Sequence, residues 1–87
     1  MPFRLTLDKT FQRRLKKKAP DQVGAVLRCV EQLGKDPRHP GLRTHPIKGA
    51  PGTFEAYVDR SNRVSWTYGK PGEIVLLNHC SHDDVLP

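Results

Sequence analysis

Residues 54–80 read FEAYVDRSNRVSWTYGKPGEIVLLNHC, and this stretch decides the fold. It contains three segments rich in aromatic and aliphatic residues, separated by the turn sequences DRSN and GKPG. Strands that follow one another through short turns usually pair as neighbours, so the stretch predicts an antiparallel meander. The three predicted strands span residues 54–58, 63–68 and 73–80.

The middle strand has two chemically different faces. Val64, Trp66 and Tyr68 fall on one side of an extended chain, and the polar residues between them, beginning with Arg63, fall on the other. The apolar side is expected to meet a layer of helices, which places Trp66 and Tyr68 in the core rather than on a base-stacking surface. Four consecutive apolar residues at 74–77 predict that the last strand is central and covered on both faces.

The residues before the meander predict one strand and two helices. Residues 2–7 alternate between apolar and polar side chains, as in a half-buried strand. Asp8 can cap a helix over residues 9–18, whose exposed faces carry six positive charges. Pro20 suits the first turn of a second helix, and Gly34 is expected to end that helix.

The predicted order of elements is therefore β-α-α-β-β-β, which belongs to the α+β class. Two layers are expected, with two N-terminal helices packed on a largely antiparallel sheet. The 87 residues, 36% of them hydrophobic, suffice for one core, so residues 1–87 are predicted to form a single domain. The loop at 35–53 holds four of the eight prolines, and its length indicates a functional loop anchored by Leu42 and Ile47.

The chain is basic, with 15 Lys and Arg against 9 Asp and Glu and a formal net charge of +6. Such a charge favours phosphate backbones, anionic lipids or an acidic protein partner, and does not choose among them. Two cysteines without a CxxC pair predict a reduced protein, with Cys29 in the core. The sequence contains neither an apolar run of membrane-spanning length nor a signal peptide pattern, which predicts a soluble, cytoplasmic protein.

The order of these motifs resembles the RelE/ParE toxin superfamily, including its RelE-, YoeB- and YafQ-like members. The resemblance covers nearly the whole chain and rests on the stretches HPIKG at 45–49, FEAYV at 54–58, NRVSWTY at 62–68 and HCSHDDVL at 79–86. It implies a first strand that lies beside the last and an antitoxin protein as partner. Many members cleave messenger RNA on the ribosome without a metal or other cofactor, whereas the ParE branch poisons DNA gyrase.

Cleavage of RNA without a metal needs a base for the 2′-hydroxyl, a cation for the phosphorane and an acid for the 5′-oxygen. Histidine titrates near neutral pH, and arginine binds phosphate oxygens in pairs. By resemblance, His82 in the tail and His45 in the loop are candidate acid–base residues, and Arg63 is the candidate phosphate ligand. The alternatives are that His82 is a surface histidine, that His45 is a loop residue fixed by Pro46, and that Arg63 is a solvated strand arginine.

Further positions bear on the chemistry. Glu55 is either a carboxylate base beside a histidine or an exposed strand residue. Asn62 stands where YafQ-like members have an acidic residue, which weakens the case for an Asp/His pair. His79 and His82 do not share one side of a strand end, so no metal site is expected.

A run of positive charge is the predicted contact with RNA or with an acidic antitoxin. The predicted RNA-binding residues are Arg13, Arg14, Lys16, Lys17 and Lys18, together with Lys48 in the loop. The predicted function is that of a type II toxin, a metal-independent endoribonuclease that acts on mRNA at the ribosome. The alternative is a protein without nuclease activity, either a ParE-like gyrase poison or an inactive relative that binds an antitoxin.

Overall fold

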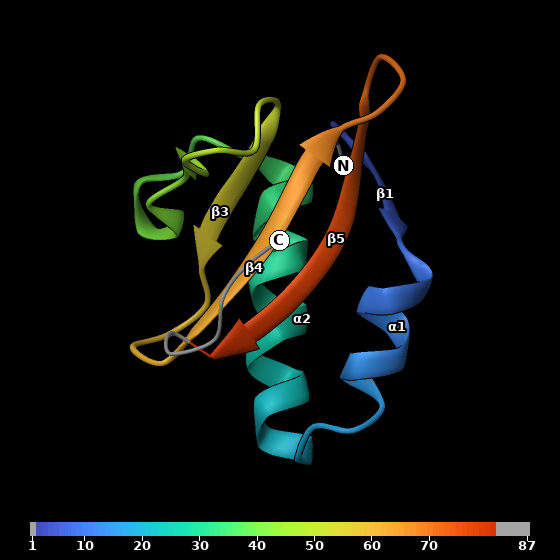
Figure 1. Cartoon of the computed structure of the whole chain (residues 1–87), viewed down its shortest axis with the longest axis vertical. Coiled ribbons are helices and arrows are strands. Elements are labelled where there is room, and N and C mark those ends of the chain that lie inside the picture. Colours follow the sequence, from blue (N-terminus) through green and yellow to red (C-terminus); the bar gives the residue numbers. More distant parts are fainter. Residues whose placement is uncertain (1, 82–87) are drawn as a thin grey trace.

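The structure is a computed structural model that describes residues 2–81 (Figure 1). It contains five strands, two α-helices and one short 3-10 helix. In chain order these are β1 (Arg4–Leu7), α1 (Lys9–Leu15), α2 (Pro20–Lys35), η1 (Pro40–Leu42), β2 (His45–Pro46), β3 (Thr53–Tyr57), β4 (Asn62–Tyr68) and β5 (Glu73–Ser81).

The strands form one mixed sheet in the order β1-β5-β4-β3-β2. β1 runs parallel to β5, and the other three pairs are antiparallel. In Figure 1 the meander β3-β4-β5 lies in front of α2, so the sheet and the helices form two layers. The α+β class, the meander and the position of the first strand beside the last are therefore confirmed.

The core lies between the helices and one face of the sheet. Phe11 of α1 and Leu33 of α2 have no exposed surface, and they share the core with Trp66 of β4, which is 1% exposed. Each large apolar side chain buried in this way contributes about 1.5–3 kcal/mol to folding. Cys29 belongs to the same core, as predicted, and Leu42 of η1 anchors the loop to it.

The loop at 35–53 contains a strand that the sequence did not predict. β2 has only two residues, and it pairs with β3 through His45 opposite Glu55 and Pro46 opposite Phe54. Proline lacks the N–H that an inner strand needs, so this segment suits the edge of the sheet. The backbone N–H of Ile47 donates to the carbonyl of Thr53 at 2.9 Å and closes the hairpin.

Both helices end at residues other than those predicted. α1 ends at Leu15 rather than at residue 18, and the N–H groups of Lys17 and Lys18 bond to the carbonyls of Arg14 and Leu15 in tighter turns. Gly34 does not end α2, which continues to Lys35. The carbonyl of Gly34 accepts a hydrogen bond from the N–H of Phe3 at 3.2 Å, which ties the end of α2 to the chain that leads into β1.

The expectation that β5 is covered on both faces was wrong. Ile74 and Leu76 are fully buried against the helices, whereas Val75 and Leu77 on the opposite side are only half-buried. A bulge opposite Ser65 and Trp66 shifts the register, so that Asn78 pairs with Ser65. The run of apolar residues therefore reflects a strand with neighbours on both edges and helices on one face.

Among residues 2–81, neither α-helix combines the length and the apolar composition that crossing a membrane requires.

Candidate functional site

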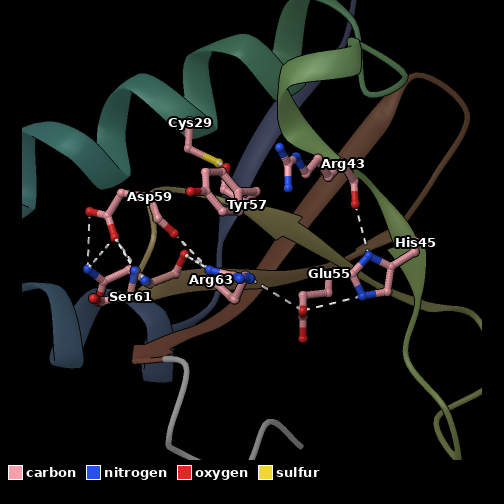
Figure 2. Close-up of polar contacts among 9 residues, drawn as sticks. Cys29, Arg43, His45, Glu55, Tyr57, Asp59, Ser61 and Arg63 are labelled. Atoms are coloured by element: carbon pink, nitrogen blue, oxygen red, sulfur yellow. Dashed lines mark hydrogen bonds and ion pairs between the residues drawn. The ribbon is translucent and has the colours of Figure 1, made fainter.

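Three charged or titratable side chains meet on the sheet face opposite the helices. His45 comes from β2, Glu55 from β3 and Arg63 from β4, as Figure 2 shows. The register explains this meeting, because His45 pairs with Glu55 directly and Arg63 pairs with Tyr57, two residues further along β3. Side chains that are opposite or diagonal across antiparallel strands lie within contact distance.

The carboxylate of Glu55 lies between the imidazole of His45 and the guanidinium of Arg63. Its Oε1 atom is 3.3 Å from Nε2 of His45 and 3.7 Å from Nε of Arg63. The Glu55 side chain is 19% exposed, which shows that it is not the exposed strand residue of the alternative interpretation.

The backbone fixes which imidazole nitrogen of His45 carries its proton. Nδ1 lies 2.9 Å from the carbonyl oxygen of Arg43, and a carbonyl oxygen only accepts hydrogen bonds. Nδ1 therefore donates, and Nε2 is the nitrogen that gains or loses a proton. The side chain is 56% exposed, so Nε2 is accessible from solvent as well as from Glu55.

The guanidinium of Arg63 is held mainly by internal contacts. Its Nη1 atom donates to the carbonyls of Asp59 at 2.7 Å and Asn62 at 3.0 Å, and the side chain is only 16% exposed. These bonds tie Arg63 to the turn between β3 and β4. They leave Nη2 as the guanidinium nitrogen without a protein contact among the described residues.

Asp59 stabilises this turn from within. Its Oδ1 atom accepts hydrogen bonds from the backbone N–H groups of Ser61 and Asn62, each at 2.9 Å. Burial raises the pKa of this carboxyl, but the hydrogen bonds from Ser61 and Asn62 and the charge of Arg63 outweigh it, and the pKa is lowered overall. The carboxylate is thus charged at neutral pH and holds the turn that positions Arg63.

A second arginine joins the cluster through Tyr57. The guanidinium carbons of Arg43 and Arg63 lie 5.2 Å and 4.6 Å from the centre of the Tyr57 ring. Cation–π contacts of this kind contribute about 0.5–1 kcal/mol each at partly exposed sites. Arg43 and Tyr57 were not identified from the sequence, because the signal is a cross-strand contact rather than a motif.

The structure places the other predicted site residues apart from this cluster. Lys48 is exposed in the turn that follows β2, where Ala50 donates its N–H to the Ile47 carbonyl. The basic residues predicted to bind RNA lie on α1 and the segment after it, in the helix layer, and most are exposed. These are Arg13, Arg14, Lys16, Lys17 and Lys18. His82 lies outside the described residues.

A pocket adjoins the cluster at the β2 edge of the sheet. Its volume is about 370 Å³, and Arg43 and His45 line it together with Phe54 and Tyr68. Tyr68 was expected in the core, but it is 47% exposed, because the helices do not extend over this end of β4. Phe54 and Trp66 face the helix side of the sheet, so the pocket opens on the side of β3 opposite to Glu55.

Comparison with solved structures assigns the fold. The RelE–RelB complex of Pyrococcus horikoshii contains a chain that matches with a TM-score of 0.78 and 16% identity, over 98% of this chain and 100% of the other. The RelBE2 toxin–antitoxin complex of Mycobacterium tuberculosis matches with a TM-score of 0.77 and 23% identity, over 94% and 100%. YafQ of Escherichia coli matches with a TM-score of 0.74 and 10% identity, over 92% and 93%.

The chain has the RelE/ParE toxin fold. No protein-family model and no curated protein matches it by sequence. Within the RelE/ParE fold, the cluster of His45, Glu55 and Arg63 occupies the sheet face that the helices leave uncovered.

Proposed function

We propose that the protein is the toxin of a type II toxin–antitoxin pair, and that it cleaves mRNA on the ribosome in the cytoplasm. The observation that carries the proposal is the cluster of His45, Glu55 and Arg63 on the open sheet face. The RelE/ParE fold supports the toxin role, and the titratable cluster supports nuclease chemistry. The solved complexes with RelB-type antitoxins support an antitoxin as partner.

The chemistry begins at the 2′-hydroxyl of the RNA. Nε2 of His45 takes the proton of this hydroxyl, whose oxygen attacks the adjacent phosphorus. The carboxylate of Glu55 stabilises the imidazolium that forms, and an arginine, for which the sequence predicts Arg63, steadies the negative charge on the phosphorane. The bond from phosphorus to the 5′-oxygen then breaks, and that oxygen receives a proton, for which His82 is the proposed donor. The products are a 2′,3′-cyclic phosphate and a 5′-hydroxyl.

Translation in vitro with the purified protein tests this proposal, with the 5′ ends of the messages mapped. Cuts at defined codon positions are expected from the unaltered protein. His45→Ala and His82→Ala are each expected to lower the cleavage rate by about 100-fold or more, which is the usual contribution of a positioned acid or base. Arg63→Ala is also expected to lower the rate, because the Arg63 guanidinium contacts Glu55.

The matched control is His39→Asn in the same loop. His39 is exposed and accepts a hydrogen bond from the N–H of Gly41 at 3.0 Å, a contact that asparagine also provides. Cleavage is expected to continue in this variant. Messages that stay intact while DNA supercoiling by gyrase is inhibited would instead support the ParE-like alternative.

A further inference from the structure

The two arginines that flank Tyr57 differ in what their guanidinium groups contact. Arg63 donates to two backbone carbonyls and faces Glu55, and its side chain is 16% exposed. Arg43 is exposed, and within residues 2–81 its guanidinium makes no hydrogen bond or ion pair. Its one protein contact there is with the Tyr57 ring, whose stacking leaves the N–H groups at the guanidinium edge available to an anion.

The backbone of Arg43 is also unusual. Its φ of 50° and ψ of 39° lie in the left-handed region, which glycine and asparagine adopt far more readily than arginine. The carbonyl of the same residue accepts the Nδ1 proton of His45 at 2.9 Å. One residue therefore orients the imidazole with its backbone and presents a cation beside it with its side chain.

We infer that Arg43 is the main ligand for the RNA phosphate, and that Arg63 is a positioning residue that holds Tyr57 and Glu55. This inference rests on the proposed function. A phosphodiester lying beside the Tyr57 ring, on the sheet face that carries Glu55, would contact the guanidinium edge of Arg43. The adjacent 2′-hydroxyl would then lie toward Nε2 of His45, which contacts Glu55 on the same sheet face. Arg63 has only Nη2 left for such a contact, which is why the assignment favours Arg43.

The test uses programmed ribosomes, with cleavage measured at increasing protein concentration and at salt concentrations from about 50 to 200 mM. Arg43→Asn removes the guanidinium and suits the left-handed backbone, so the fold is retained. It is expected to lower cleavage efficiency by about tenfold, as for a lost hydrogen bond to a charged group. The slope of log efficiency against log salt is expected to fall by about 0.7, as for one lost phosphate contact.

Three further variants separate a specific contact from general charge. Arg43→Lys is expected to restore the salt slope but not the full efficiency, because lysine lacks the paired donors. Arg63→Gln is expected to lower efficiency and leave the slope unchanged. Arg4→Asn is the matched control, since Arg4 is exposed on β1 at the opposite edge of the sheet.

Each outcome gives a decision. If the unaltered protein cleaves messages and Arg43→Asn has an unchanged salt slope, this inference is overturned and the proposed function stands. If the salt slope falls in Arg63→Gln but not in Arg43→Asn, the phosphate contact belongs to Arg63, and the inference about Arg43 is overturned. If the unaltered protein cuts no message, the inference and the proposed function fail together.

Discussion

A single carboxylate oxygen organises the candidate site at the scale of residues. Oε1 of Glu55 lies within 4 Å of both His45 and Arg63, and each of the three residues comes from a different strand. The guanidinium of Arg63 supplies a positive charge beside this half-buried carboxylate. Glu55 contacts Nε2, the nitrogen that takes the proton in the proposed reaction, and the Arg43 carbonyl orients the ring through Nδ1.

Glu55→Gln tests this role with almost no change in size. The amide keeps the shape of the side chain but removes the negative charge that stabilises the imidazolium of His45. The cleavage rate on programmed ribosomes is expected to fall by about 10- to 1,000-fold, because the proton acceptor loses its stabilising partner. Glu31→Gln is the control, since Glu31 forms an exposed ion pair with Lys35 on α2. An unchanged rate in Glu55→Gln would limit Glu55 to holding the strands together.

The site was predictable from the sequence only in part, for a reason that lies at this scale. His45 and Arg63 were identified because their types and motif positions suit RNA chemistry. Their common contact with Glu55 depends on the pairing register of three strands, and one of those strands has no recognisable pattern. Arg43 was missed for the same reason, since its role depends on a left-handed backbone and on an aromatic ring 14 positions further along the chain.

The meander was the most predictable part of the fold at the scale of elements. Residues 63–68 alternate strictly, and turn residues flank them, so strand, turn and face all follow from local chemistry. β2 could not be found in this way, because two residues that include a proline show no periodicity. Its pairing arises from the loop that η1 and Leu42 hold against the core.

His79 links two elements, and it predicts a dependence of stability on pH. It is 1% exposed on β5, its Nε2 lies 3.1 Å from the Phe11 carbonyl of α1, and its ring meets the Phe11 ring edge-on. Burial lowers the pKa of this imidazole, the hydrogen bond to Phe11 raises it, and the charges of Lys18 and Arg14 lower it further. The folded protein therefore keeps His79 neutral below the pH at which the unfolded chain binds a proton.

The sign of the effect follows from that difference. Above the ordinary histidine value of 6.5 neither state is protonated and the full stability is present. As the pH falls below 6.5, the unfolded chain binds the proton first. The free energy of unfolding then decreases until the pH reaches the lowered pKa of His79 in the folded protein. Urea unfolding at about pH 5 and pH 7.5 measures the decrease. His79→Leu is expected to make this loss of stability at low pH smaller, and His39→Asn is expected to leave the loss unchanged. An equal decrease in His79→Leu would place the pH dependence elsewhere.

The basic residues and the candidate site lie on opposite layers at the scale of the whole molecule. The run Arg13–Lys18 belongs to α1 and the segment after it, α1 packs on β5, and His45 lies at the far edge of the sheet. The molecule measures 32 × 29 × 26 Å, and charges in about 0.1 M salt are screened beyond about 10 Å. The run therefore has little direct influence on the proton transfer at His45. It can assist only by contacting a target large enough to reach both layers, as a ribosome is.

Replacement of Lys16, Lys17 and Lys18 by glutamine separates these two effects. If the lysines contact ribosomal RNA, the protein concentration for half-maximal cleavage rises, and the salt slope falls by up to about 0.7 for each lost contact. The rate at saturating protein is expected to stay unchanged, because His45, Glu55 and Arg63 are untouched. A lower saturating rate with an unchanged half-maximal concentration would contradict this separation. If both values stay unchanged while binding to an acidic antitoxin weakens, the charge serves the partner rather than the ribosome.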